Sequence, residues 1–240
     1  MLVRYPNEEA LAIAAAKIFI EQFHKAINRS GRFNVLLSGG ATPRRTYEYL
    51  AEEPFKDQVD WSRVDFFWGD ERCVDSNDPL SNYLMVNEAL LSHIAIPANQ
   101  IHPILCSQNP HKSAILYENT LRKYFSHSKP SFDLVFLGLG VDGHIASLFP
   151  QASALKERER WFIAVQKETE DFARITVTLP ILNLAQLIVF LVTNEEKSKI
   201  LEKVLSQEEP STTLPARLIQ PINGKLFWLV DASVFTNFVS

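Results

Sequence analysis

The sequence is short of glycine, with 8 glycines among 240 residues where an average composition of about 7% would give roughly 17. Six of the eight lie in three short stretches, at 39–40, at 69 and at 138–143. Glycine tolerates a positive φ and allows a ligand to approach the backbone closely. A chain that avoids glycine elsewhere is therefore expected to need it in these three stretches, and we look for a functional site there.

Cysteine is also scarce. Cys73 and Cys106 are too few for a disulfide framework or for a zinc site built on cysteine pairs. The six histidines show no HExxH spacing, so we expect no metal. These absences predict a reduced, cytoplasmic protein in which Cys73 is a packing residue.

The chain has neither a long apolar run nor an excess of positive charge. No hydrophobic stretch approaches the about 18 residues of a membrane span, and Pro6, Glu8 and Glu9 stand where a signal peptide would be apolar. The 24 basic residues are outnumbered by 28 acidic ones, which argues against a nucleic-acid partner. Because 46% of the residues are hydrophobic, a disordered chain is excluded as well. A globular protein without a membrane or nucleic-acid partner is expected.

Helical and strand patterns alternate along almost the whole chain. Helices are predicted at 8–29, 43–52, 80–92, 111–126 and 195–205. Strands are predicted at 33–37, 64–68, 101–105, 133–137, 161–165, 174–179, 187–192 and 226–230. Several strands are continuous apolar runs, which is typical of a parallel sheet covered on both faces. The pattern indicates an α/β fold, a three-layer, doubly wound, mainly parallel sheet in one domain over 1–240, with room for a small lobe.

The first glycine stretch follows the strand at 33–37. Gly39 and Gly40 lead into a helix for which Thr42 is the predicted N-cap and Pro43 the first residue. Ligands of open α/β sheets bind outside the carboxyl ends of the strands. Helix amides together with the hydroxyls of Ser38 and Thr42 would suit an anion, with phosphate as the expected ligand. A capped tight turn without a ligand is the alternative.

The second stretch, Gly69 to Arg72, also follows an apolar strand. Asp70 and Glu71 could orient sugar hydroxyls, and Arg72 could hold an anion. Taken in isolation, the segment is more typical of a solvated charged turn.

The third stretch contains a literal G-x-G-x-x-G at 138–143. We reject a dinucleotide site, because that fingerprint runs into a long helix and here Pro150 follows within two turns. Asp142 and His144 are placed on a glycine-rich turn at a strand end, where a histidine can act as a general base. A structural histidine that caps the turn is the alternative.

Taken together, LSGGATP (37–43), FFWGDER (66–72), DPLSNY (78–83) and LGLGVDGHIASLFP (137–150) resemble the 6-phosphogluconolactonase family. The stretches at 174–183, 190–201 and 214–230 agree with it. The resemblance implies a Rossmann-like α/β fold similar to that of the glucosamine-6-phosphate deaminases. It also implies hydrolysis of a sugar-phosphate lactone in the pentose phosphate pathway, without a metal or cofactor.

The same resemblance implies roles for individual residues. The implied phosphate ligands are Ser38, Gly39, Gly40, Thr42, Arg174 and Lys197. Asp70 and Glu71 would face the substrate, His144 would be the base with Asp142 beside it, and Arg72 would stabilise oxyanion charge or bind. Arg44 and Arg217 depart from the family pattern and could add charge to the phosphate pocket.

Two other functions stay open. A sugar-phosphate deaminase or isomerase resembles the chain around 142–146, but there the stretch typically continues FNEP, and here Phe149 stands at the position of the acid. A non-catalytic sugar-phosphate sensor would lose the base, whereas Asp142 and His144 are both present. We expect a monomer or a weak homodimer, and whether 210–220 acts as a lid is left open.

Overall fold

The computed structural model describes residues 1–126, 130–206 and 214–235. The strands are β1 (Leu2–Tyr5), β2 (Phe33–Leu37), β3 (Val64–Trp68), β4 (Asp70–Arg72), β5 (Ile101–His102), β6 (Leu134–Gly138), β7 (Phe162–Gln166), β8 (Ala173–Val177), β9 (Leu187–Val192) and β10 (Lys225–Asp231). The α-helices are α1 (Glu8–Ser30), α2 (Ala41–Ala51), α3 (Asn82–Ala89), α4 (Pro110–Tyr124), α5 (Leu179–Leu182) and α6 (Ser198–Leu205). No helix in these ranges is both long and apolar enough to span a bilayer.

The main sheet has the order β1-β10-β9-β6-β2-β3-β5, and all its pairs are parallel. From β2 the chain moves to one side, to β3 and β5, and from β6 it moves to the other side, to β9 and β10. Val35 of β2 is paired with Phe66 of β3 and with Leu134 of β6. The direction of winding therefore reverses between β2 and β6, the position where open α/β sheets bind ligands.

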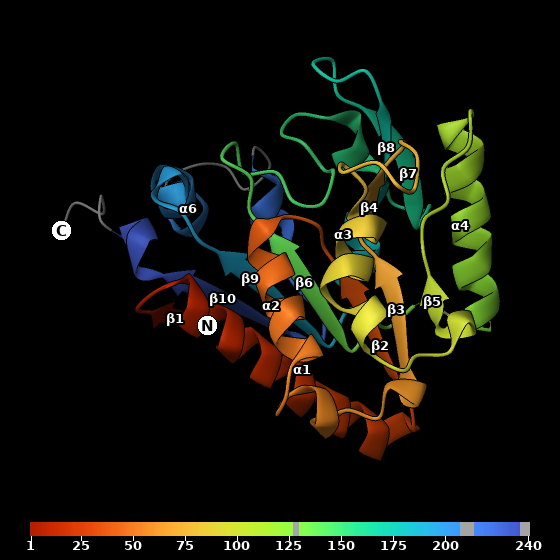
Figure 1. Cartoon of the computed structure of the whole chain (residues 1–240). Coiled ribbons are helices and arrows are strands. Elements are labelled where there is room, and N and C mark those ends of the chain that lie inside the picture. Colours follow the sequence, from red (N-terminus) through yellow and green to blue (C-terminus); the bar gives the residue numbers. More distant parts are fainter. Residues whose placement is uncertain (127–129, 207–213, 236–240) are drawn as a thin grey trace.

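A second, antiparallel sheet of order β4-β8-β7 stands above the carboxyl end of β3 (Figure 1). It joins the main sheet directly, because Gly69 follows β3 and its carbonyl accepts the amide of Val177 at 2.8 Å. The predicted strands at 161–165 and 174–179 exist, but they belong to this small sheet, and the sequence pattern missed β1 and β4. The predicted α/β class with a mainly parallel sheet is confirmed.

Helix α1 shows how directly the sequence specifies the scaffold. Asn7 caps it by accepting the amide of Ala10 at 2.8 Å, and Gly31 ends it with a φ of 79°. Its apolar face, which includes Leu11, Phe19 and Phe23, is buried against the sheet. Figure 1 shows α1, α2 and α3 on the same side of the main sheet. This layer holds the starts of α2 and α3 beside the carboxyl ends of β2 and β3.

Several predicted boundaries differ from those of the structure, and two of the differences have a clear physical reason. Helix α2 begins at Ala41, and its N-cap residue is Gly40 with a φ of 107°, so Thr42 lies inside the first turn instead of capping it. The strand predicted at 101–105 ends at His102, because Pro103 has no amide hydrogen for the ladder.

The expectation for the cysteines is also wrong, since Cys73 and Cys106 form a disulfide with a Cα–Cα distance of 5.1 Å. Cys73 directly follows β4, and Cys106 lies in the loop after β5. Counting cysteines could not reveal this pair, because its proximity follows from the neighbouring positions of β3 and β5 in the sheet.

We expect Cys106→Ser to lower the free energy of unfolding by about 2–4 kcal/mol, because the bridge closes a loop across a sequence separation of 33 residues. Chemical denaturation of the two proteins without reductant measures the difference. Thiol titration of the denatured wild type should find no free thiol. Two free thiols and equal stabilities would contradict the prediction.

Candidate active site

A cavity of about 190 Å³ opens where β2, β3 and β6 end. The predicted residues that line it are Ser38, Gly39, Gly40, Thr42, Asp70, Arg72, His144, Arg174 and Lys197. Other residues that line it are Ala41, Pro43, Asn82, Gly138, Leu139, Gly140, Ala146 and Leu191. Segments far apart in the sequence thus meet at the reversal point of the main sheet, beside the small sheet.

The loop between β2 and α2 forms one wall. The buried Tyr47 holds the backbone of Ser38 in place. Its hydroxyl accepts a hydrogen bond from the Ser38 amide at 3.1 Å and donates one to the Ser38 carbonyl at 2.9 Å. The Thr42 hydroxyl is 2.7 Å from that of Thr193 at the end of β9. The first amides of α2 have no partner within the helix and carry its positive dipole end. This wall therefore favours an anion.

Lys197 supplies a positive charge to the same cavity from the short helix Glu195–Lys197. Burial lowers the pKa of its ammonium group, although Glu8 and Asp231 act in the opposite direction. Within the described ranges no carboxylate forms an ion pair with it. A partly buried cation without a partner is costly unless an anion is bound, so Lys197 indicates an anionic ligand.

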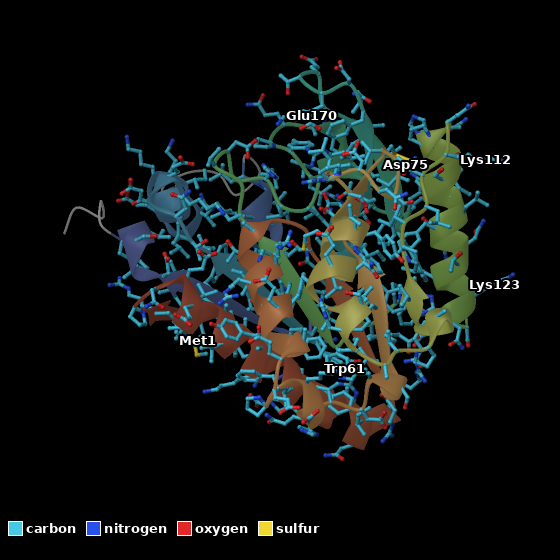
Figure 2. All side chains as sticks on the ribbon, in the orientation of Figure 1. Met1, Trp61, Asp75, Lys112, Lys123 and Glu170 are labelled. Atoms are coloured by element: carbon cyan, nitrogen blue, oxygen red, sulfur yellow. A yellow bond between two sulfur atoms is a disulfide. The ribbon has the colours of Figure 1, made fainter. Side chains whose placement is uncertain are left out.

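The two arginines of the cavity lie opposite each other on adjacent strands of the small sheet. Arg72 on β4 is paired in register with Arg174 on β8, and like charges directly opposite each other destabilise a sheet. The positive charge of Arg174 is partly neutralised by Glu170, because Arg174 donates two hydrogen bonds of 2.8 and 2.7 Å to its carboxylate. These bonds lower the pKa of Glu170. Figure 2 shows Glu170 at the upper end of the molecule, on the connection between β7 and β8.

The acidic segment Asp70–Arg72 forms strand β4, so its side chains point alternately to two faces. Asp70 and Arg72 point into the cavity, while Glu71 between them does not line it. The Glu71 carboxylate accepts the amides of Arg72, Asn82 and Tyr83, each at 2.8 Å. Burial raises the pKa of this carboxyl group. The structure therefore places Glu71 as an anchor for the start of α3 and not among the residues that line the cavity, although the sequence resemblance implied that it faces the substrate.

His144 lies in the loop after β6 and lines the cavity. Its Nδ1 is 2.6 Å from Oδ1 of Asp142, which also accepts the His144 amide at 3.0 Å. Burial opposes ionisation of Asp142, but these contacts with His144 outweigh it and lower the pKa of the carboxyl group. An ionised Asp142 requires Nδ1 to carry the hydrogen, which leaves Nε2 as the basic nitrogen. Asp142 itself does not line the cavity; it orients the ring.

Two neighbours fix the environment of the imidazole. The ring of His144 lies against Gly140, where a Cβ atom would overlap Nδ1 and Cε1. The ring of Phe149 is 5.1 Å from it, centroid to centroid. The G-x-G-x-x-G stretch thus provides room for a histidine, and the chain continues from it through turns to the short helix Ser153–Lys156.

Sequence reasoning missed Asn82, which lines the cavity from the first turn of α3. Neighbouring side chains of β4 point to opposite faces, so Glu71 points toward α3 when Asp70 points into the cavity. The Glu71 carboxylate binds the amide of Asn82, and this contact brings the Asn82 side chain beside Asp70. Arg44 and Arg217 are not among the residues that line the cavity. Of the lid segment 210–220, residues 210–213 lie outside the described ranges, and the amide of Ala216 donates to the Gly143 carbonyl at 3.2 Å.

Comparison with known proteins identifies the family of the chain. A family model described as glucosamine-6-phosphate isomerases/6-phosphogluconolactonase matches residues 6–228. The chain is 37% identical over 232 residues to a 6-phosphogluconolactonase from Nostoc sp., which covers 95% of this chain and 94% of that protein.

Solved structures of this family have the same fold as this chain. A 6-phosphogluconolactonase from Trypanosoma cruzi has a TM-score of 0.87 and 27% identity, covering 100% of this chain and 97% of that one. A monomeric glucosamine-6-phosphate deaminase has a TM-score of 0.80 at 18% identity, covering 97% of this chain and 98% of that one, and this likeness shows the fold alone. The chain belongs to the family of glucosamine-6-phosphate isomerases and 6-phosphogluconolactonases.

Proposed function

We propose that this protein hydrolyses 6-phospho-D-glucono-1,5-lactone to 6-phospho-D-gluconate. The observation that carries the proposal is the oriented His144–Asp142 pair in a cavity that also holds Lys197. A base with a free Nε2 suits activation of water, and an unpaired cation beside a helix start suits a phosphate. Relatives that carry the 6-phosphogluconolactonase name support it.

The reaction needs only groups of this chain. Nε2 of His144 takes a proton from water while the water oxygen forms a bond to C1 of the lactone. The carbonyl oxygen becomes an oxyanion, and the bond between C1 and the ring oxygen then breaks. The ring oxygen receives the proton from the imidazolium, so His144 is regenerated and the product is an open-chain acid. The phosphate, remote from C1, contributes binding energy that orients the ring over His144.

Arg72 is the group we assign to the oxyanion or to substrate binding. Its Nη1 donates to the carbonyl of Leu80 at 2.6 Å, which fixes the guanidinium. Its Nε is buried and has no hydrogen-bond acceptor among the described residues. A fixed cation that lines the cavity can stabilise a negative charge that develops there.

Hydrolysis is favoured over deamination by the surroundings of the imidazole. The aromatic ring of Phe149 occupies the position where the sequence of a deaminase typically has a glutamate. Asp142 hydrogen-bonds the side of the ring that faces away from Nε2. Ring opening of an amino sugar would require a second acid–base group at this place, and Phe149 cannot supply it.

The direct test is hydrolysis of freshly generated 6-phosphogluconolactone, coupled to 6-phosphogluconate dehydrogenase and compared with the spontaneous rate. We expect a rate that increases in proportion to enzyme concentration. Binding of 6-phosphogluconate without acceleration would indicate a sensor, and ammonia release from glucosamine 6-phosphate would indicate a deaminase. Either result would refute the proposal.

We expect Lys197→Met to raise KM roughly 10- to 100-fold with little change in kcat, because one charge-assisted hydrogen bond to phosphate is lost. The low pKa of the free ammonium predicts in addition that wild-type KM rises with pH before an ordinary lysine would lose its proton. Steady-state kinetics on the lactone between neutral and mildly alkaline pH measure both effects.

Arg44→Met is the matched control for that charge change. Arg44 is a cation on α2 that is paired with Glu48 at 3.1 Å and with Glu88 at 3.7 Å, outside the cavity. Its KM should stay at the wild-type value. Equal effects of the two substitutions would mean that general electrostatic attraction, and not a phosphate contact at Lys197, determines KM.

A further inference from the structure

We propose that Ser147 is a positioning residue whose buried hydroxyl holds the Asp70 carboxylate in the cavity as the acceptor for a hydroxyl group of the sugar. The inference rests on the proposed function and deepens it, because it assigns recognition of the sugar ring, as distinct from the phosphate, to one pair of residues.

Ser147 connects the loop that carries His144 to the small sheet through two hydrogen bonds. Its side chain is fully buried, and its hydroxyl donates to Oδ2 of Asp70 at 2.6 Å. Its amide donates to the hydroxyl of Thr176 at 3.1 Å. Asp70 and Thr176 are themselves a register pair of β4 and β8. Both anchors of Ser147 thus belong to one rung of the sheet, three residues along the chain from His144.

Asp70 has only neutral hydrogen-bond partners, as the buried Glu71 has, but of the two only Asp70 lines the cavity. It is 5% exposed and lines the cavity, yet among the described residues it forms no ion pair. Arg174 approaches only as far as the intervening Ser147 hydroxyl, at 3.5 Å. A buried carboxylate held only by neutral donors is unfavourable on its own. Its place at the cavity wall therefore indicates a hydrogen-bond acceptor for a ligand.

Asn82 holds the other side of the same carboxylate. Its Nδ2 donates to the Asp70 carbonyl at 2.9 Å and lies 3.3 Å from Oδ1. The amide side chain fills the space above Gly39, where a Cβ atom would overlap it. A carboxylate accepts about four hydrogen bonds, and Ser147 and Asn82 use two. The remaining capacity of Asp70 is available to the hydroxyl of a sugar, a donor that a phosphate does not offer.

The test is a double-mutant cycle of Ser147→Ala and Asp70→Asn. We expect each single substitution to lower kcat/KM on the lactone roughly 10- to 100-fold, the range for loss of a hydrogen bond to a charged group. Because Ser147 acts through Asp70, the double variant should be no worse than Asp70→Asn. Losses that multiply in the double variant would overturn the proposal.

Substrate discrimination separates positioning from a merely structural role. Among lactones that lack one ring hydroxyl each, the wild type should discriminate against at least one, and both single variants should lose that discrimination. Ser113→Ala is the matched control, because Ser113 is a buried serine of α4 whose hydroxyl bonds to Ser107, outside the cavity. It should lower thermal stability and keep the discrimination. Discrimination retained by Ser147→Ala would refute the inference.

The outcome is distinguishable from failure of the proposed function. Wild-type hydrolysis alone reports on the function, whereas the inference is read from the coupling between Ser147 and Asp70. That coupling is also measurable in the unfolding midpoints of the four proteins without any substrate. Additive midpoints would count against the pair even if the wild type hydrolyses the lactone.

Discussion

His144→Ala should fold normally and lose about 10²- to 10⁴-fold in kcat, the contribution of a positioned general base. The imidazole lies on a turn at the end of β6 and is only partly buried, so its removal leaves the core unchanged. Nothing else in the described part of the cavity has the same combination of a basic nitrogen and an orienting carboxylate. The measurement is the coupled lactone assay, with circular dichroism and thermal unfolding to establish that the variant is folded.

Two further variants define what that loss means. His111→Ala removes an exposed histidine at the start of α4, outside the cavity, and should keep the wild-type rate. Asp142→Asn keeps the ring but no longer favours the hydrogen on Nδ1, so its loss should be smaller than or equal to that of His144→Ala. In the double variant Asp142→Asn should add nothing. A His144→Ala enzyme with near-wild-type turnover would remove His144 as the base.

The sequence predicts the main sheet and α1 better than the small sheet because their local sequence patterns are stronger. Strand β9 (LIVFLV) is an uninterrupted apolar run, and α1 carries its own caps, so the positions of both follow from local chemistry. Strand β4 has three residues with a charge at each, and its conformation depends on pairing with β8. Such a segment has no local pattern that distinguishes it from a solvated turn, and in isolation its sequence predicts a turn.

The same distinction applies to the site. The glycine stretches marked the strand ends that meet at the cavity, because glycine there reports a local need for space. The sequence could not predict that Asp70 lines the cavity while Glu71 binds the start of α3, since this depends on which face of β4 turns toward α3. The disulfide and the Ser147–Asp70 bond are likewise consequences of topology: they join residues 33 and 77 positions apart.

Gly140→Ala should lower kcat nearly as much as His144→Ala while leaving the protein folded. A Cβ atom at position 140 would overlap the imidazole, which is a movable side chain, so the ring would be displaced and the backbone would not. The backbone at Gly140 lies outside the positive-φ region, so alanine causes no strain there. Loss of the bond from Nδ1 to Asp142 then removes the orientation on which the base depends, at a cost bounded by about 10⁴-fold. The coupled lactone assay and thermal unfolding measure the two effects.

The background of His144→Ala decides whether that explanation is right. If alanine at 140 acts only by displacing the ring, it should cost nothing further once the ring is absent, and kcat of the double variant should equal that of His144→Ala. Gly138→Ala, two residues earlier, is the control for folding, because a Cβ atom there meets nothing within 4 Å. Its unfolding midpoint should match that of Gly140→Ala. A further loss in the double variant would show that residue 140 contacts the substrate directly, and the glycine would then serve the ligand instead of the histidine.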